Sequence, residues 1–189
     1  PAALSNRMVH LEFDVHLDDW LAWAERSGVR SEVTAFLRFR PKLLHDFDPQ
    51  SASRAFASPR SWAFVSAIMN ARPSRDVEYG LYRGAVGDGA AAEFMGFLQV
   101  WRELPSVEEV LAAPLQAPVP AEPAALYAVS EALASGVSRE NFSRACAYLD
   151  RLPVEFGVLC MRQAVCRDPG LVESAAFGDW AQKHADVLL

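Results

Sequence analysis

The spacing of apolar residues is the feature that most limits what this chain can fold into. Beyond residue 16, apolar side chains recur three or four positions apart in one run after another, as Trp62, Val65 and Ile68 do. This spacing places them on one face of an α-helix, whereas a half-buried strand needs strict alternation. The chain is therefore predicted to be all-α. The expected helices begin near residues 18, 32, 59, 75, 90, 106, 124, 139, 154 and 171.

Serine, glycine and proline lie between these apolar runs, at positions where they commonly begin or end helices. Ser58 is followed by Pro59, so it is the expected N-cap of a helix that has proline in its first position. Gly28 is expected to end the first helix. Gly84 to Gly89 follows a helix rather than a strand, so it predicts a helix break and not a dinucleotide-binding loop. The other expected N-caps are Ser31, Ser74 and Ser138.

One segment has the pattern of a strand. From Val9 to Val15 apolar and polar residues alternate, which predicts a single half-buried strand. No second convincing strand pattern follows it, so we expect its sheet to lie upstream of Pro1.

Prolines mark the best internal boundary. Residues 114–123 contain four prolines and predict a linker or an extended strap. The expected organisation is a strand segment at 1–15, a helical bundle at 16–113, the proline-rich segment at 114–123 and a second helical bundle at 124–189.

Charge and hydropathy exclude some classes of function. Residues 1–75 hold 10 Lys and Arg against 8 Asp and Glu, whereas residues 76–189 hold 8 against 16. Nucleic-acid binding needs a basic face, so it is disfavoured, and no apolar run approaches the length of a membrane span. We expect a cytoplasmic protein that binds neither nucleic acid nor membrane, since no secretory signal is evident.

Cysteine and histidine give no metal-ligand pattern. Cys146, Cys160 and Cys166 are spaced by 14 and 6 residues, which fits no zinc ribbon, and we expect them to be reduced thiols in the core. The histidines contain no pair four residues apart, so no metal site is predicted. They are His10, His16, His45 and His184.

Two arginines lie in segments that resemble parts of AAA+ ATPases. The stretch from Pro1 to Leu11 resembles the "P-x-x-L-x-N-R-F" segment that leads into the last strand of the ATPase core, with Arg7 at the arginine position and Met8 where Phe is commoner. Ser58-Pro59-Arg60-Ser61-Trp62 resembles the "[ST]-P-R-x-W" start of a lid helix. Either arginine alone could be an ordinary surface residue, but both segments occur in the expected order.

The resemblance implies a role for each arginine. In the family, the residue matched by Arg7 is an arginine finger that acts in trans on the nucleotide of a neighbouring subunit. The residue matched by Arg60 is the sensor-2 arginine, which meets the nucleotide in cis. A guanidinium at either place stabilises charge on phosphoryl oxygens. Arg38 and Arg40 receive no such role, and salt bridges are the expected explanation for them.

The stretch "AFLRFRPKLLHDFDP" at 35–49 resembles the lid of MoxR-like AAA+ ATPases. The resemblance covers residues 1 to about 105 and extends more weakly beyond. It implies that 1–15 is the end of the ATPase core, 16–113 the helical lid and 124–189 a C-terminal helical extension. It also implies three partners: the upstream core, neighbouring subunits of a homo-oligomeric ring and a von Willebrand A-type protein.

The chain also departs from the family. It has no G-x-x-x-x-G-K-[ST] loop and no apolar strand that ends in Asp-Glu for Mg²⁺. ATP and Mg²⁺ are therefore expected only in the parent protein, and this chain alone is expected to be inactive.

Two other functions stay open. One is a self-standing helical interaction module, in which the acidic second half grips a basic partner and the arginines are incidental. The other is nucleic-acid binding through a clamp-loader-like collar, which the acidic balance after residue 75 disfavours.

Overall fold

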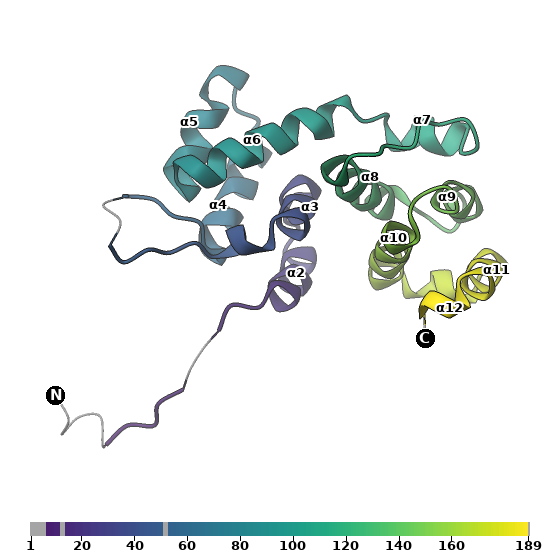
Figure 1. The fold of residues 1–189 in the computed structure, drawn as a ribbon, viewed down its shortest axis with the longest axis horizontal. Helices are drawn as coiled ribbons and strands as arrows, with labels where there is room; N and C mark the ends of the chain where they lie inside the picture. The colour runs from purple at the N-terminus through teal and green to yellow at the C-terminus, as the bar shows by residue number, and fades with distance from the viewer. Residues whose placement is uncertain (1–6, 12–13, 51–52, 189) are drawn as a thin grey trace.

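The structure is a computed structural model that describes residues 7–11, 14–50 and 53–188, and this part of the chain is all-α (Figure 1). The first half comprises α2 (Leu17–Arg26), α3 (Ser31–Phe39), η1 (Pro41–Leu44), α4 (Pro59–Asn70), α5 (Arg75–Val86) and α6 (Asp88–Glu103). The second half comprises α7 (Val107–Ala112), α8 (Pro123–Gly136), α9 (Phe142–Leu149), α10 (Val154–Arg167), η2 (Pro169–Glu173), α11 (Ala175–Lys183) and α12 (Ala185–Leu188).

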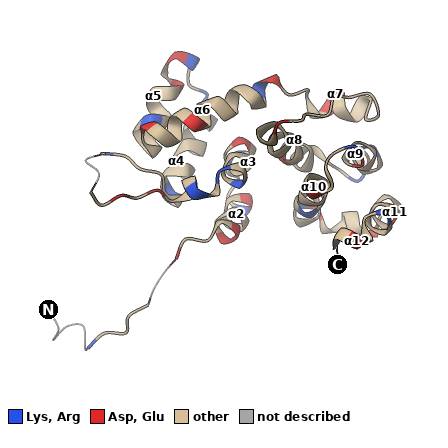
Figure 2. Cartoon of the chain, viewed as in Figure 1, with Lys and Arg blue, Asp and Glu red and all other residues tan. Residues whose placement is uncertain are grey.

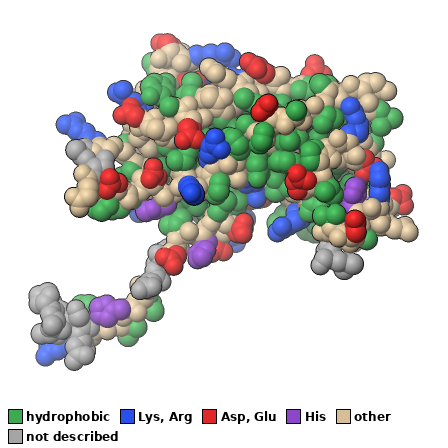
Figure 3. Space-filling view, viewed as in Figure 1, with side chains coloured by type: hydrophobic (Ala, Val, Ile, Leu, Met, Phe, Trp, Pro, Cys, Tyr) green, Lys and Arg blue, Asp and Glu red, His purple; other side chains and the backbone are tan. Residues whose placement is uncertain are grey.

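The strand expected between Val9 and Val15 is wrong for the residues that the structure describes there. Residues 9–11 and 14–15 belong to no strand, and Val9 and Leu11 are each 87% exposed. Residues 12–13 lie outside the described part. The physical reason is that a strand needs a neighbour for its backbone hydrogen bonds, and the described residues contain no other strand. In Figure 3 this segment stands away from the body of the molecule.

Local sequence signals account for several helix ends. Gly28 has a φ of +67°, and α2 ends just before it. Ser58 and Ser61 form a reciprocal capping box at the start of α4, with Pro59 as the first helical residue. Ser106 caps α7 in the same way with Glu109. These ends are set within a few residues of sequence, which is why they can be predicted.

Other helix ends differ from the predicted ones. Ser31 is not a cap but the first residue of α3, and its Oγ lies 2.9 Å from Oγ of Ser135 on α8. Ser138 is not the cap of α9, because that helix begins at Phe142 after Asn141. The single helix expected to begin near residue 171 is divided into η2, α11 and α12.

The predicted break at Gly84 to Gly89 is confined to one residue. α5 continues to Val86 and α6 begins at Asp88, so only Gly87 separates them. Gly87 has a φ of +87°, and a Cβ there would lie 2.8 Å from the carbonyl oxygen of Ala55. Glycine is needed at this position for both its conformation and its closeness to the 45–57 loop.

Aromatic residues dominate the core of the first half, which we call the first cluster. Phe36 is fully buried, and its ring lies 5.3 Å from that of Trp62, 5.1 Å from that of Phe94 and 5.5 Å from that of Phe97. Burial of each such ring contributes about 1.5–3 kcal/mol. α3, α4 and α6 are thus held on one side of the molecule.

A second apolar core, the second cluster, joins α7 to α11. Val110, Leu133 and Leu149 are among its buried members. The proline-rich segment lies against this cluster as a strap, because the Tyr148 hydroxyl donates to the Pro118 carbonyl at 2.7 Å and Arg151 donates to that of Pro114 at 2.5 Å. α7 also packs in this second cluster, so the two apolar cores divide before residue 107. The predicted boundaries between domains, at 113 and 124, stay predictions.

α3 and α8 lie side by side and join the two clusters (Figure 1). The paired residues run in opposite directions along the two helices. Ser31 meets Ser135, Thr34 meets Glu131, and the ring of Phe39 lies 5.9 Å from that of Tyr127. We call this antiparallel contact the seam. Ala128 of α8 is fully buried and belongs to the first cluster, so the seam is partly apolar.

Candidate functional site

Arg60 occupies the second position of α4, and its side chain is exposed. The Ser58 hydroxyl accepts a hydrogen bond of 3.2 Å from the Ser61 N–H, and Pro59 has no N–H. The described residues provide no hydrogen bond or ion pair to the Arg60 side chain or to its N–H. A guanidinium and a helix-start N–H therefore both remain available to an external group, a combination that favours anions.

A shallow groove lies beside Arg60. It has a volume of about 290 Å³ and is lined by Trp20, Trp23, Pro59, Arg60 and Ala63. The Trp20 indole N–H donates to the Pro59 carbonyl at 3.1 Å, which ties α2 to the start of α4. The Trp23 side chain is 42% exposed, and its ring lies 6.1 Å from that of Trp20. The groove thus presents aromatic surface next to an uncompensated cation.

Arg7 lies in the exposed segment that precedes α2. No contact joins it to Arg60 within the described residues, and Figure 1 shows its segment apart from the helices. The two predicted arginines are therefore not brought together in one site within this chain.

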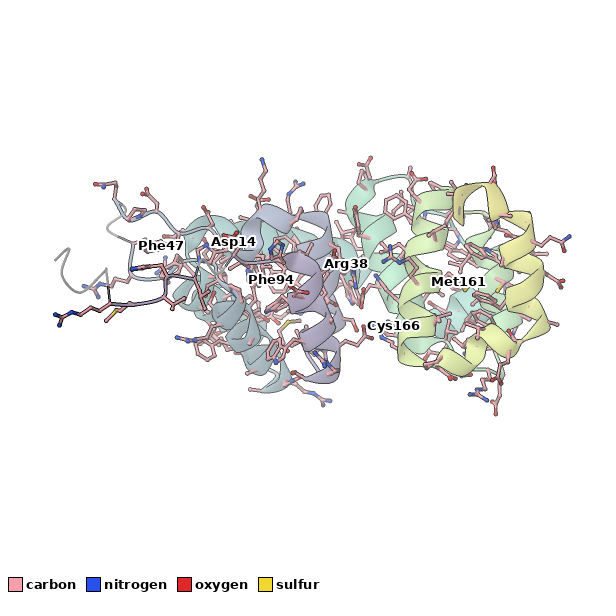
Figure 4. All side chains as sticks on the ribbon, turned by 90° about the horizontal axis from the view of Figure 1, so that it is seen from below. Asp14, Arg38, Phe47, Phe94, Met161 and Cys166 are labelled. Carbon is pink, nitrogen blue, oxygen red and sulfur yellow. The ribbon has the colours of Figure 1, made fainter. Side chains whose placement is uncertain are left out.

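Arg40 and Arg38 form the salt bridges expected of them. The Arg40 Nε lies 2.8 Å from a carboxylate oxygen of Glu93, and its guanidinium stacks over the ring of Phe39. Arg38 lies 3.4 Å from Glu131 across the seam. Figure 4 shows Arg38 between the half that contains Phe94 and the half that contains Met161. Figure 2 shows basic and acidic residues intermixed on both halves.

Glu131, which is not among the residues selected from the sequence, is the centre of a buried polar network. Its side chain is 1% exposed. It accepts hydrogen bonds from Arg167 at 2.6 Å and from Thr34 at 3.1 Å, while Arg167 also pairs with Glu25. The network thus connects α2, α3, α8 and α10. A carboxylate in the apolar run of α8 was the available signal, because a buried charge requires partners.

A hollow with a volume of about 700 Å³ lies at the end of the seam where α3 begins and α8 ends. Arg30 and Arg102 line it, but each is already paired. Arg30 bonds to Glu32, and Arg102 donates to both carboxylate oxygens of Glu78 at 2.7 and 2.8 Å. Burial raises the pKa of the neighbouring Tyr82, so its hydroxyl stays protonated. Both arginines of the hollow are therefore compensated by carboxylates, and they leave no unpaired cation there to select an anion.

Within the described residues, no group of three or more His, Cys, Asp or Glu side chains is placed to hold a metal ion. Two cysteines are core thiols, and burial raises the pKa of Cys146 to about 11. The expectation of a third core thiol is wrong, because Cys166 is exposed. It is the last residue but one of α10.

Comparison with models of protein families gave no match, and comparisons with curated proteins and with solved structures also gave none. None of the described helices combines the length and the apolar character that a membrane span requires.

Proposed function

We propose that this chain is the lid and helical extension of a MoxR-like AAA+ ATPase and that Arg60 contacts the nucleotide held by the upstream core. The observation that carries this proposal is the state of Arg60. It is exposed at the capped start of α4, next to the tryptophan groove, and the described residues leave its guanidinium without a partner.

The physical argument is electrostatic. A guanidinium that forms no internal ion pair can be directed to phosphoryl oxygens, and the capped helix start fixes its backbone. Trp20 holds this helix start through Pro59, so movement of the lid displaces the arginine and its helix together. The core supplies ATP and Mg²⁺, and this chain supplies a cation in cis.

Arg7 has the complementary role in the proposal. The segment that carries Arg7 extends away from the helices (Figure 1), so Arg7 can reach a neighbouring subunit. The resemblance assigns Arg7 to the nucleotide site of that subunit. The oligomer is then a homo-oligomeric ring, with a von Willebrand A-type protein as a further candidate partner.

The test joins this chain to an AAA+ core that carries the missing phosphate loop. Arg60→Ala is expected to lower ATP hydrolysis by roughly 10²–10³-fold, the size of the loss when one charge-stabilising donor is removed. Arg75→Ala is the matched control, because Arg75 is an exposed first-turn arginine of α5. Equal activity of the Arg60 variant, the Arg75 variant and the parent would exclude the nucleotide role.

A specific observation supports the alternative, a module that binds a basic partner. The second half exposes acidic side chains that form no ion pair within the described residues, among them Glu122, Glu140, Glu155 and Asp179. Binding of an oligolysine peptide to the whole chain, weakened by salt and unaffected by Arg60→Ala, would favour this module. Binding that salt does not weaken would count against it.

A further inference from the structure

The two clusters are connected by a single crossing of the chain. α6 ends at Glu103 and α7 begins at Val107, so residues 104–106 form the crossing. Leu104 packs against both clusters and is only partly buried. Rotation of a few backbone angles in this short segment would therefore turn the second half relative to the first once the contacts of the seam, including the burial of Ala128 in the first cluster, have opened.

The crossing borders the 700 Å³ hollow. Leu104, Pro105 and Ser106 line it from one side, and residues 28–32 and the end of α8 line it from the others. Because side chains do not fill this space, displacement of the crossing meets few packed atoms. A densely packed interior would resist the same movement.

The Glu131 network holds the clusters together farther along the seam. Glu131 belongs to α8, whereas two of its partners, Thr34 and Arg38, belong to α3 of the first cluster. Arg167 extends the network from α10 to Glu25 of α2. Together with the Ser31–Ser135 contact, these groups form the polar part of the seam, and separation of the two helices would break them together.

The network is incompletely satisfied. Arg38 Nε and Glu131 Oε2 are 3.4 Å apart and buried, yet neither has a hydrogen-bond partner. Both polar atoms of the neighbouring Gln163 side chain are also buried without a partner. Buried groups that lack hydrogen bonds gain by exposure to water, which offsets part of what is lost when the clusters separate.

We propose that residues 104–106 are a hinge and that the Glu131 network is a latch, so that the chain has a closed arrangement and an open one. The latch specifies the closed arrangement, and release of Glu131 frees the second cluster to turn about the hinge. This inference does not depend on the proposed nucleotide role.

The experiment measures distances between spin labels in the full chain. One label is placed on Cys166, the exposed native cysteine, and the other on Ala67→Cys at an exposed position of α4. The latched protein is expected to give one distance. Glu131→Gln, which removes the charge but keeps the shape, is expected to add a second population at a different distance, with helix content unchanged.

Glu93→Gln is the matched control, since it breaks an exposed pair with Arg40 that lies within the first half and does not cross the seam. It is expected to leave the single distance unchanged. A second variant, Arg38→Gln, removes another member of the latch and gives the same test should the Glu131 variant not fold. One unchanged distance in a folded latch variant would overturn the proposal, and so would a second distance in the control.

A disulfide across the seam provides a second test, because it should prevent the movement that the Glu131 variant allows. Ser31 and Ser135 face each other across the seam with their Oγ atoms 2.9 Å apart, so paired cysteines there would add a second covalent connection. In the Glu131→Gln protein, oxidation of this pair before labelling is expected to remove the second distance, and reduction to restore it. Persistence of the second distance in the oxidised protein would contradict a movement at the seam.

Discussion

Glu131 and Arg167 lie on neighbouring helices of the second half, and the Arg167 guanidinium donates to the buried Glu131 carboxylate at 2.6 Å. The same carboxylate accepts a hydrogen bond from Thr34 and pairs with Arg38, both on α3. A single carboxylate, 1% exposed, therefore connects the core of one half to the other.

Removal of this carboxylate is expected to be strongly destabilising. Glu131→Ala leaves two guanidinium groups without their buried partner, and such a loss costs about 3–5 kcal/mol. Glu93→Ala is expected to cost less than about 1 kcal/mol, because that pair is about half exposed. Denaturant midpoints of the two variants measure the difference. Similar midpoints would show that the Glu131 network contributes no more to stability than the exposed Glu93 pair does.

The aromatic core of the first cluster predicts a contrast between two phenylalanines. Phe94 is fully buried against Phe36, Trp62 and Tyr82, so Phe94→Ala is expected to lower the free energy of unfolding by about 3–5 kcal/mol. Phe64 is 55% exposed, and Phe64→Ala is expected to change it by less than about 1 kcal/mol. Chemical unfolding of both variants provides the comparison, and equal losses would argue against the described core.

Gly87 is expected to resist substitution more than a helical glycine does. Gly87→Ala combines a φ of +87° with a Cβ only 2.8 Å from the Ala55 carbonyl oxygen, so a loss of more than about 1 kcal/mol is expected. Gly80→Ala in α5 meets no atom within 4 Å and is expected to stabilise the helix by about 0.5–1 kcal/mol. If the melting temperatures of the Gly87 and Gly80 variants moved in the same direction, the described conformation of Gly87 would be contradicted.

Asp150 gives a prediction about acid stability. Burial raises its pKa, but hydrogen bonds from Lys183 and His184 outweigh burial and hold the pKa below its ordinary value of 3.8. A lowered pKa in the folded state means that the stabilisation is complete above about pH 4 and is lost as the pH falls through the folded pKa. Asp150→Asn is therefore expected to reduce the free energy of unfolding at neutral pH.

The acid dependence distinguishes this pair from general acid unfolding. The difference between Asp150→Asn and the parent protein should shrink as the pH falls below 4, because the parent then loses the same charge. Asp179→Asn is the control, since Asp179 is exposed and forms no ion pair within the described residues. A difference that stays constant down to pH 2 would rule out the Asp150 carboxylate as its source.

How far the sequence predicted the fold depends on the range of the interactions. The helices at 59–70 and 154–167 follow from apolar spacing and from local start and stop signals, and the capping box at Ser58 lies within four residues. The strand at Val9 was wrong because alternation specifies which face is apolar but supplies no neighbouring strand. Ser31 was misassigned because its hydroxyl faces Ser135, which is 104 residues away.

The candidate site was predicted only in part. Arg60 and its capped helix start are a local pattern, so the sequence could place them. The tryptophan groove needs α2 to pack on α4, and the Glu131 network needs residues that lie 36 and 97 positions apart along the chain. No spacing rule relates such residues, and only the packed fold reveals their contacts.

The most direct test of the proposed function mixes subunits in a ring whose core has been restored. Subunits with Arg7→Ala are combined with subunits whose phosphate-loop lysine is replaced, and ATP hydrolysis is measured. If Arg7 acts in trans and Arg60 in cis, this mixture regains activity, because an intact core can meet an intact Arg7 from its neighbour. The corresponding mixture with Arg60→Ala stays inactive. Hydrolysis at the parent rate by either variant alone, or recovery in the Arg60 mixture, would contradict the proposal.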